Sequence, residues 1–264
     1  MATFQTMTGV KLPLQLTLFV GNVLKIKIVP GRGELVPFKL SISPDKSLLL
    51  TADDVRTKAN FEIYELKANG PGFVRFEAQN AKGTKAGPIS VTIKPLFTLP
   101  TGNADQLALI KLLLAESPSP YSANYNATTA KTGLQWMRLV VKNRLDMKSG
   151  RVGSQGATSM IDVIKSPGQF KGFEEYPIIG TKQQGNITDI LTIANDGTHP
   201  KQKLFADHIA AAIAAATEQA IVDPCPTKLL SWRTAGASSP GGDFKLYKSF
   251  SGQDFYTIPA ADKK

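Results

Sequence analysis

Polar and apolar residues alternate in short segments through the first third of the chain. LQLTL at residues 14–18 and LKIKI at 24–28 place apolar side chains at every second position, as do residues 61–66, 73–77 and 89–93. Side chains of a strand point alternately to its two faces, so a period of two predicts half-buried β-strands. Clusters rich in Gly, Pro, Asn and Asp separate the segments and indicate turns. Short strands at this spacing predict a β-sandwich.

This first region is similar to the bacterial Ig-like modules. The likeness lies in the order of the strands and in GFVRFEA at residues 72–78, followed by ISVTI at 89–93. It implies an Ig-like sandwich over residues 1–97 that serves as a spacer, an adhesive unit or a docking surface.

Helical spacing replaces the alternation after residues 95–100. From Asp105 onward, Leu107, Ile110 and Leu114 share one helical face, and further leucines make this helix apolar almost all round. A helix of this kind is normally buried. More helices are predicted beyond it. They are a helix over 134–145, a helix that begins at a capping box of Ser159 with Asp162, and an Ala-rich helix over 200–221; residues 244–258 indicate a small hairpin.

The length of 264 residues and a hydrophobic fraction of 42% suit two globular domains. The predicted fold class is therefore multidomain α+β. It consists of an N-terminal Ig-like β-sandwich over residues 1–97 and a mostly α, lysozyme-like domain over 98–264.

Four motifs follow one another in the second region. They are LLLAES at 112–117, LVVKNRL at 139–145, VIKSPGQF at 163–170, and DP at 223–224 with GQDFY at 252–256. In this order they resemble the SleB-type cell-wall hydrolases, the family that includes spore-cortex lytic enzymes. The resemblance covers nearly all of residues 100–260. It implies a lysozyme-like fold and lytic transglycosylase activity, which cuts between N-acetylmuramic acid and N-acetylglucosamine without net hydrolysis, with Glu116 as the catalytic residue.

The chain departs from the family pattern at three places. The family often continues past its Glu with A-R-G-E, whereas this chain has Ser117 and Pro118. Residues 121–131 form an insertion, and Asp254 stands where the family has a His. These departures concern the shape of the substrate groove more than the chemistry at Glu116.

The position of Glu116 suits a general acid. Pro118 disfavours helical geometry at Ser117, so the helix is expected to end at Glu116. There the carboxylate faces the negative end of the helix dipole, and the leucine-rich segment before it supplies an apolar wall. Both effects raise the pKa of the carboxyl group, as proton donation near neutral pH requires.

Six further residues are candidates for substrate binding, because amide and aromatic side chains recognise sugars: Gln169, Phe170, Tyr121, Tyr125, Tyr176 and Tyr256. The alternative for each of them is packing in the core or at the surface. Asn143 and Arg144 are expected to be structural, with Arg144 tying helix ends together.

Other kinds of chemistry fit less well. A hydrolase would need a second carboxylate, but no spacing places Asp146, Asp162, Glu174 or Glu175 opposite Glu116. Cys225, the only cysteine, lies between two prolines, which argues against a cysteine peptidase using His199 or His208. Two histidines and one cysteine show no metal-ligand spacing, so neither metal nor cofactor is expected.

The net charge of +10 and the pI of about 9.6 suit an anionic polymer such as peptidoglycan. The sequence lacks a basic cluster interleaved with aromatic residues, the pattern typical of nucleic-acid binding. No apolar run reaches the ~18 residues of a membrane span. Residues 1–20 do not resemble a secretory signal, so export to the periplasm or wall by a non-Sec route is expected after synthesis in the cytoplasm.

We therefore expect an antibacterial effector that binds glycan strands, with a delivery apparatus and an immunity protein as further partners. The alternatives are a phage-type lysin, a hydrolytic muramidase, and a non-enzymatic wall-binding or assembly protein with a degenerate hydrolase domain.

Overall fold

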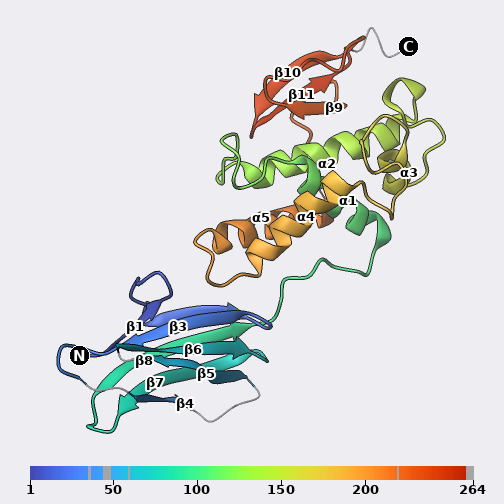
Figure 1. Cartoon of the computed structure of the whole chain (residues 1–264). Coiled ribbons are helices and arrows are strands. Elements are labelled where there is room, and N and C mark those ends of the chain that lie inside the picture. The colour runs from blue at the N-terminus through green and yellow to red at the C-terminus, as the bar shows by residue number, and fades with distance from the viewer. Residues whose placement is uncertain (35–36, 44–48, 59, 219, 260–264) are drawn as a thin grey trace. The chain divides into compact units, whose positions relative to one another are not determined.

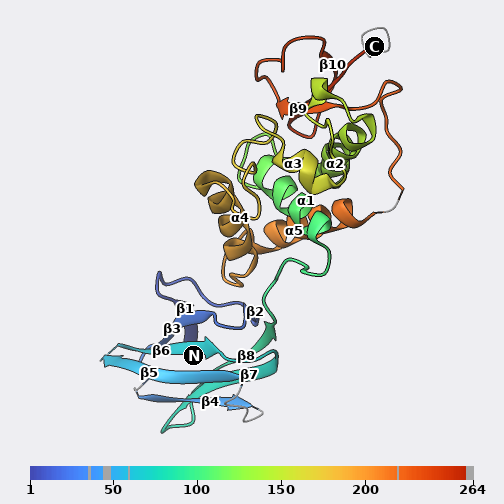
Figure 2. The same ribbon diagram turned by 90° about the vertical axis from the view of Figure 1, so that its right-hand side faces the viewer.

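The computed structural model describes residues 1–34, 37–43, 49–58, 60–218 and 220–259. The chain divides into two compact units (Figures 1 and 2). One unit comprises Met1–Phe97 with the short segment Asn195–Gln202, and the other comprises Thr98–Ala194 with Lys203–Lys264. The first consists of strands, and the second combines helices with a small sheet.

Two four-stranded sheets build the first unit. One sheet has the order β1-β3-β6-β5, formed by Thr3–Thr6, Val23–Val29, Phe61–Ala68 and Leu50–Lys58. The other has the order β2-β8-β7-β4, formed by Gln15–Phe19, Lys85–Lys94, Gly72–Asn80 and Phe38–Ser43. Strands β2 and β8 run parallel, and all other neighbouring pairs in these two sheets run antiparallel.

The alternating segments of the sequence bury one face of each sheet in a shared core. The Phe4 ring of β1 meets the Phe76 ring of β7 edge-on at 4.9 Å, so the two sheets touch. Polar groups also join the sheets, because the Phe38 N–H of β4 donates to Glu62 Oε2 of β6 at 2.6 Å. The Tyr64 hydroxyl of β6 donates to the Phe38 carbonyl at 2.8 Å. The unit is therefore a sandwich with a single core.

The five strands expected from alternation are present as β2, β3, β6, β7 and β8. Three further strands were not expected. Strand β1 has only four residues, and β5 carries Asp53 and Asp54 beside a register shift, so neither shows a clear period of two. Strand β4 reads FKLSIS, which does alternate and could have been recognised.

The second unit contains five α-helices among its described residues. They are α1 Ala104–Glu116, α2 Ala130–Met147, α3 Met160–Lys165, α4 Thr181–Ala194 and α5 Gln202–Thr217. A 3-10 turn, η1, spans Gly150–Val152. An antiparallel sheet of order β10-β11-β9 follows, formed by Lys245–Phe250, Gln253–Thr257 and Ser231–Thr234.

Helix α1 is the buried centre of this unit. Seven consecutive or nearly consecutive side chains between Ala108 and Ala115 are buried, and the helix packs against α2, α3 and α4. Its first turn is capped by Asn103, whose side chain accepts from the Gln106 N–H at 3.1 Å. The prediction of a helix apolar almost all round, and therefore buried, is confirmed.

The other helices differ from expectation in their extent. The capping box of Ser159 with Asp162 is present and begins α3, as predicted. Helix α5 ends at Thr217 rather than at Ile221. Helix α4 was not expected, because TKQQGNITDILTIA contains Gly185, several β-branched residues and only three buried positions. The closing hairpin is present as β10 and β11, with β9 added beside β11.

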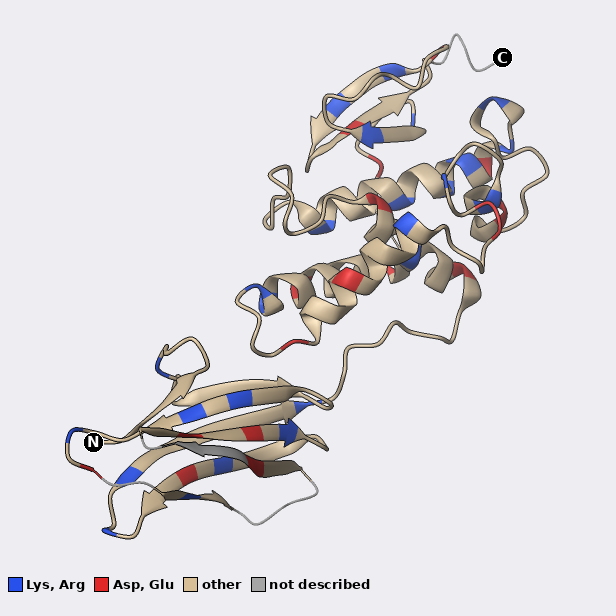
Figure 3. Ribbon diagram, in the orientation of Figure 1, with Lys and Arg blue, Asp and Glu red and all other residues tan. Residues whose placement is uncertain are grey.

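Lys and Arg are spread over both units (Figure 3). No helix in the described part of the chain is both long enough and apolar enough to cross a membrane.

Replacement of Phe76 by Ala tests the core of the sandwich. Phe76 is 1% exposed, so its removal leaves a cavity and should lower the free energy of unfolding by about 3–5 kcal/mol. Phe73 on the same strand is 47% exposed, and its replacement by Ala should change this free energy by less than about 0.5 kcal/mol. Urea unfolding of the full chain, followed by circular dichroism, compares the two. Equal losses would contradict this packing.

Candidate active site

Glu116 is the last residue of α1. Ser117 leaves the helix with an extended backbone (φ −75°, ψ 156°), and its N–H still bonds to the Leu113 carbonyl at 3.0 Å. Pro118 follows, and a residue before proline is disfavoured in the helical region. The helix therefore ends where the sequence predicted.

A cavity of about 370 Å³ opens beside Glu116. Its wall combines the end of α1, Arg144 of α2, the loop after α3, strand β9 and the beginning of β11. The lining residues are Glu116, Arg144, Arg151, Gly168, Gln169, Phe170, Ser231, Trp232, Arg233, Thr234, Pro240, Phe244 and Gln253. Among these, Glu116 is the one carboxylic acid, and Gln169 and Phe170 of the predicted groove lie on the same wall.

The pKa of Glu116 is raised above its usual range. Burial is the main cause, because the low-dielectric surroundings disfavour the charged carboxylate. A hydrogen bond from the Gln183 side chain and the positive charges of Lys182 and Arg233 act in the opposite direction but do not cancel it. A carboxyl group with a raised pKa stays protonated to higher pH, which is the state that a proton donor needs.

Arg144 holds several parts of the cavity lining together. Its Nε donates to the Leu230 carbonyl at 2.7 Å, and an Nη donates to Gln169 Oε1 at 2.8 Å. The guanidinium also lies 5.3 Å from the Phe170 ring, whose other neighbour is the Trp232 ring at 5.1 Å. Burial lowers the pKa of Arg144 to about 10. Arg144 thus has the structural role expected from the sequence, but it joins α2 to the loop after α3 and to the residue before β9 rather than tying helix ends together.

Three arginines make the cavity electropositive. Arg144 is buried, and Arg151 is paired with Asp243. Arg233 is exposed and makes no ion pair within the described residues. A cavity with more cationic than acidic side chains favours an anionic ligand.

Two buried polar side chains, Gln253 and His208, contact the end of α1. Gln253 Nε2 donates to the Glu116 carbonyl at 3.0 Å, and His208 Nε2 lies 3.2 Å from Ser117 Oγ. In the part of the chain that is described, Gln253 Oε1 and His208 Nδ1 are buried without a hydrogen-bond partner. A buried polar atom without a hydrogen bond lowers the stability of the fold, so the contacts that position Glu116 carry a cost in stability.

The four tyrosines proposed for substrate binding do not line the Glu116 cavity. Tyr121 is exposed, lies against Phe205 and borders another cavity, and Tyr125 packs against the His208 ring at 5.4 Å. Tyr176 is buried beneath Lys111, and Tyr256 is buried in β11. Packing explains the positions of the two buried rings, and a role for the four in substrate binding stays a prediction.

The other acids proposed as a second carboxylate also lie outside the cavity lining. Asp146 pairs with Lys142, and Asp162 accepts bonds from Thr158 and Ser159 at the start of α3. Glu174 accepts from the Gly172 N–H, and Glu175 is exposed. Asp254, at the position where the family has a His, accepts from the Gly236 N–H and from Ser249 Oγ.

Cys225 and the histidines do not form a nucleophile pair in the structure. Cys225 is buried with its Sγ 3.4 Å from Thr227 Oγ1, whereas His208 faces Ser117. Within the described residues no group of three or more His, Cys, Asp or Glu side chains could hold a metal ion.

Trp232, Arg233 and Gln253 line the cavity but were not singled out from the sequence. Gln253 lies within the GQDFY motif, so the motif marked its position without indicating its contact. The short SWRT strand carried no comparable signal.

Replacement of His208 by Gln tests the buried imidazole. Burial lowers its pKa from 6.5 to about 4, so the unfolded chain takes up a proton first as the pH falls. Above about pH 6.5 His208 is neutral in both the folded and the unfolded chain, and its full contribution to the free energy of unfolding is present. As the pH falls toward 4, only the unfolded chain binds the proton, so this free energy decreases by about 3 kcal/mol. Urea unfolding between pH 7 and 4 should show this decrease in the unaltered chain but not in the His208→Gln variant. Parallel pH dependences would contradict the burial of a neutral imidazole.

Comparison with known proteins adds little to this geometry. No family model and no curated protein matches the sequence. Domains 4 and 5 of the S-layer protein SbsC align with a TM-score of 0.24 and 12% identity over 30% of this chain and 46% of that one. The titin M10–obscurin-like 1 Ig complex aligns with a TM-score of 0.23 and 18% identity over 37% of this chain and 97% of that one. Astrotactin-2, a vertebrate-specific perforin-like membrane protein, aligns with a TM-score of 0.22 and 13% identity over 93% of this chain and 42% of that one. Scores this low carry no argument about fold or function.

Proposed function

We propose that the second unit cleaves the glycan strand of peptidoglycan as a lytic transglycosylase, with Glu116 as its general acid and base. The observation that carries the proposal is a single carboxyl group, with its pKa raised by burial, on the wall of a polar cavity. Gln169 and Phe170, from a motif far along the chain, share that wall. The SleB-like order of motifs supports the same assignment.

The proposed reaction needs one acid. Protonated Glu116 gives its proton to the glycosidic oxygen as the bond from C1 of the muramyl unit to that oxygen breaks. The carboxylate then takes the proton of the muramyl C6 hydroxyl while this oxygen bonds to C1. An anhydro ring forms, Glu116 is protonated again, and no water is consumed.

The absence of a second acid from the cavity lining favours this route over hydrolysis. A hydrolase places its second carboxylate about 5–5.5 Å away for retention or about 6.5–9.5 Å away for inversion. Glu116 is the one acid among the lining residues, and Asp146, Asp162 and Glu174 are bonded elsewhere.

The rest of the lining suits a charged glycan. The half-buried Trp232 and Phe244 offer aromatic surface for sugar rings, and the half-buried Gln169 offers an amide for acetamido and hydroxyl groups. Arg233, which has no described ion-pair partner, is available to a carboxylate of the peptide stem.

We further propose that the first unit is an Ig-like docking module and the second a lysozyme-like domain, together forming an antibacterial effector that acts in the periplasm or wall. The two-sheet sandwich offers a rigid surface for a delivery apparatus. A phage-type lysin would use the same chemistry in another setting.

Replacement of Glu116 by Gln should lower lytic activity on purified sacculi by about 100- to 10,000-fold, because the amide cannot donate or accept the proton. Turbidity loss measures the rate, and mass spectrometry of the products from the unaltered chain should show fragments one water lighter than hydrolysis products. Replacement of the exposed Glu175 by Gln is the matched control and should leave the rate unchanged.

Retained activity in the Glu116 variant would end the assignment. Products of full hydrolytic mass would indicate a muramidase. Sacculus binding without lysis by the unaltered chain would indicate a wall-binding protein.

The pH profile of the reaction provides a second test. Because the pKa of Glu116 is raised, activity should persist above the usual titration range of a glutamate and fall as the pH rises through the raised pKa. Lys182 lowers this pKa, so Lys182→Gln should move the falling limb to higher pH by less than about one unit, since exposed charges are screened. Lys171→Gln, also at an exposed lysine, should not move it. The measurement is kcat/KM on a soluble glycan between pH 4 and 9, and a shift to lower pH in the Lys182 variant would contradict the assignment.

A further inference from the structure

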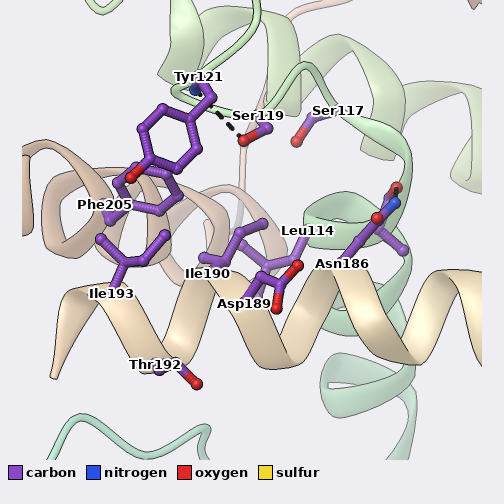
Figure 4. A pocket seen from close by; sticks show the side chains of 11 residues that line it. Leu114, Ser117, Ser119, Tyr121, Asn186, Asp189, Ile190, Thr192, Ile193 and Phe205 are labelled. Carbon is purple, nitrogen blue, oxygen red and sulfur yellow. Dashed lines mark hydrogen bonds between the residues drawn. The ribbon is translucent and has the colours of Figure 1, made fainter.

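A second cavity, of about 290 Å³, borders the end of α1 (Figure 4). Helices α1, α4 and α5 and the loop after α1 build its wall. Ala115 and Ser117, the residues on either side of Glu116, both border it. Asn186 of α4 fixes this junction, because its Nδ2 donates to the Ala115 carbonyl at 3.2 Å. The proposed acid thus lines one cavity, and its two chain neighbours border another.

The floor of this second cavity is apolar. Leu114, Ile190 and Phe205 are buried beneath it, and Ile193 adds a half-buried side chain. The exposed Tyr121 ring stands edge-on against Phe205 at 5.0 Å and extends the apolar wall. Such a floor accepts aliphatic groups rather than hydroxyl-rich ones.

One acidic side chain gives this cavity its charge. Asp189 lies on its lining, and Figure 4 shows its carboxylate beside Ile190 and Asn186 on the cavity side of α4. Asp189 has no hydrogen bond or ion pair through its side chain within the described residues. The cavity thus combines an unpaired carboxylate with an aliphatic floor, in a chain of net charge +10.

The two cavities are opposite in charge. The first contains Arg144, Arg151 and Arg233 around Glu116, and the second contains Asp189. A ligand that spans both would present anionic groups to one and a cation on an aliphatic chain to the other. The glycan sugars carry no cation, but the peptide stems attached to them carry carboxylates together with the side-chain amine of a diamino acid.

We propose that the second cavity binds the aliphatic side chain of this diamino acid, with its ammonium group on Asp189. The proposal rests on the proposed function and assigns the peptide stem, in addition to the glycan, to the substrate. The volume of about 290 Å³ is at the small end of ligand pockets, so it suits one amino-acid side chain rather than a disaccharide.

Binding without turnover tests this assignment. The full chain carrying Glu116→Gln is titrated by calorimetry with a soluble disaccharide bearing a peptide stem with a free side-chain amine, and with the same compound acetylated at that amine. Acetylation should weaken binding about two- to fivefold, as expected for one charge pair that involves the exposed Asp189. Adding Asp189→Asn should abolish this difference. Adding Asp207→Asn, at an exposed acid of α5 that pairs with Lys203, should preserve it.

Three outcomes separate this inference from the proposed function. Equal affinity for the free and acetylated amine, or a difference that survives Asp189→Asn in a variant whose circular dichroism is unchanged, would overturn the amine site. Lysis of sacculi by the unaltered chain together with either result would leave the proposed function intact. Discrimination that depends on Asp189, in a chain that leaves the glycan uncut, would support the amine site and overturn the catalytic role of Glu116.

Discussion

Helix α1 buries apolar side chains on nearly all of its faces, and the second unit is arranged around it. A helix of this composition is stable only when other elements cover it, so α2, α3 and α4 must pack against it. The polar residue at its end, Glu116, is then brought to the margin of the core, where desolvation raises its pKa. The same burial that stabilises the fold therefore produces the chemical property on which the proposed acid depends.

The cavities beside Glu116 follow from how that helix end is held. Gln253 bonds to the Glu116 carbonyl, His208 faces Ser117, and Asn186 bonds to the Ala115 carbonyl, so three different elements fix three successive residues. The Gln253 and Asn186 bonds satisfy carbonyl groups that a helix end leaves without intrahelical partners. The three contacts also leave Gln253 Oε1 and His208 Nδ1 buried without described partners. Such atoms cost stability, and these two lie on the side chains that hold the residue proposed as the acid.

The sequence predicted best those features that depend on local physical rules. Alternation identified five strands of the sandwich, all-round apolarity identified α1 as buried, and Pro118 located the helix end at Glu116. Contacts between segments far apart in the chain could not be predicted from it. Nothing in SWRT indicates that Trp232 lies against Phe170 or that Arg233 comes close enough to Glu116 to lower its pKa, because β9 takes its place by pairing with β11. Tyr176 and Tyr256 are buried, and the sequence could not distinguish packing from binding for them, since an aromatic residue near a motif is as useful for one as for the other.

The opposing influences on Glu116 fit a group that must both give and regain a proton. Burial alone would raise its pKa until the carboxylate became a costly state, and the second half of the proposed reaction requires that carboxylate. The Gln183 hydrogen bond and the charges of Lys182 and Arg233 lower the pKa and so keep the ionised form accessible. Lys182 and Gln183 belong to the first turn of α4, the helix that the sequence did not predict. The element that escaped recognition is thus the one that moderates the acidity of the residue that was recognised, and α4 also carries Asp189 and Asn186 on its next turns.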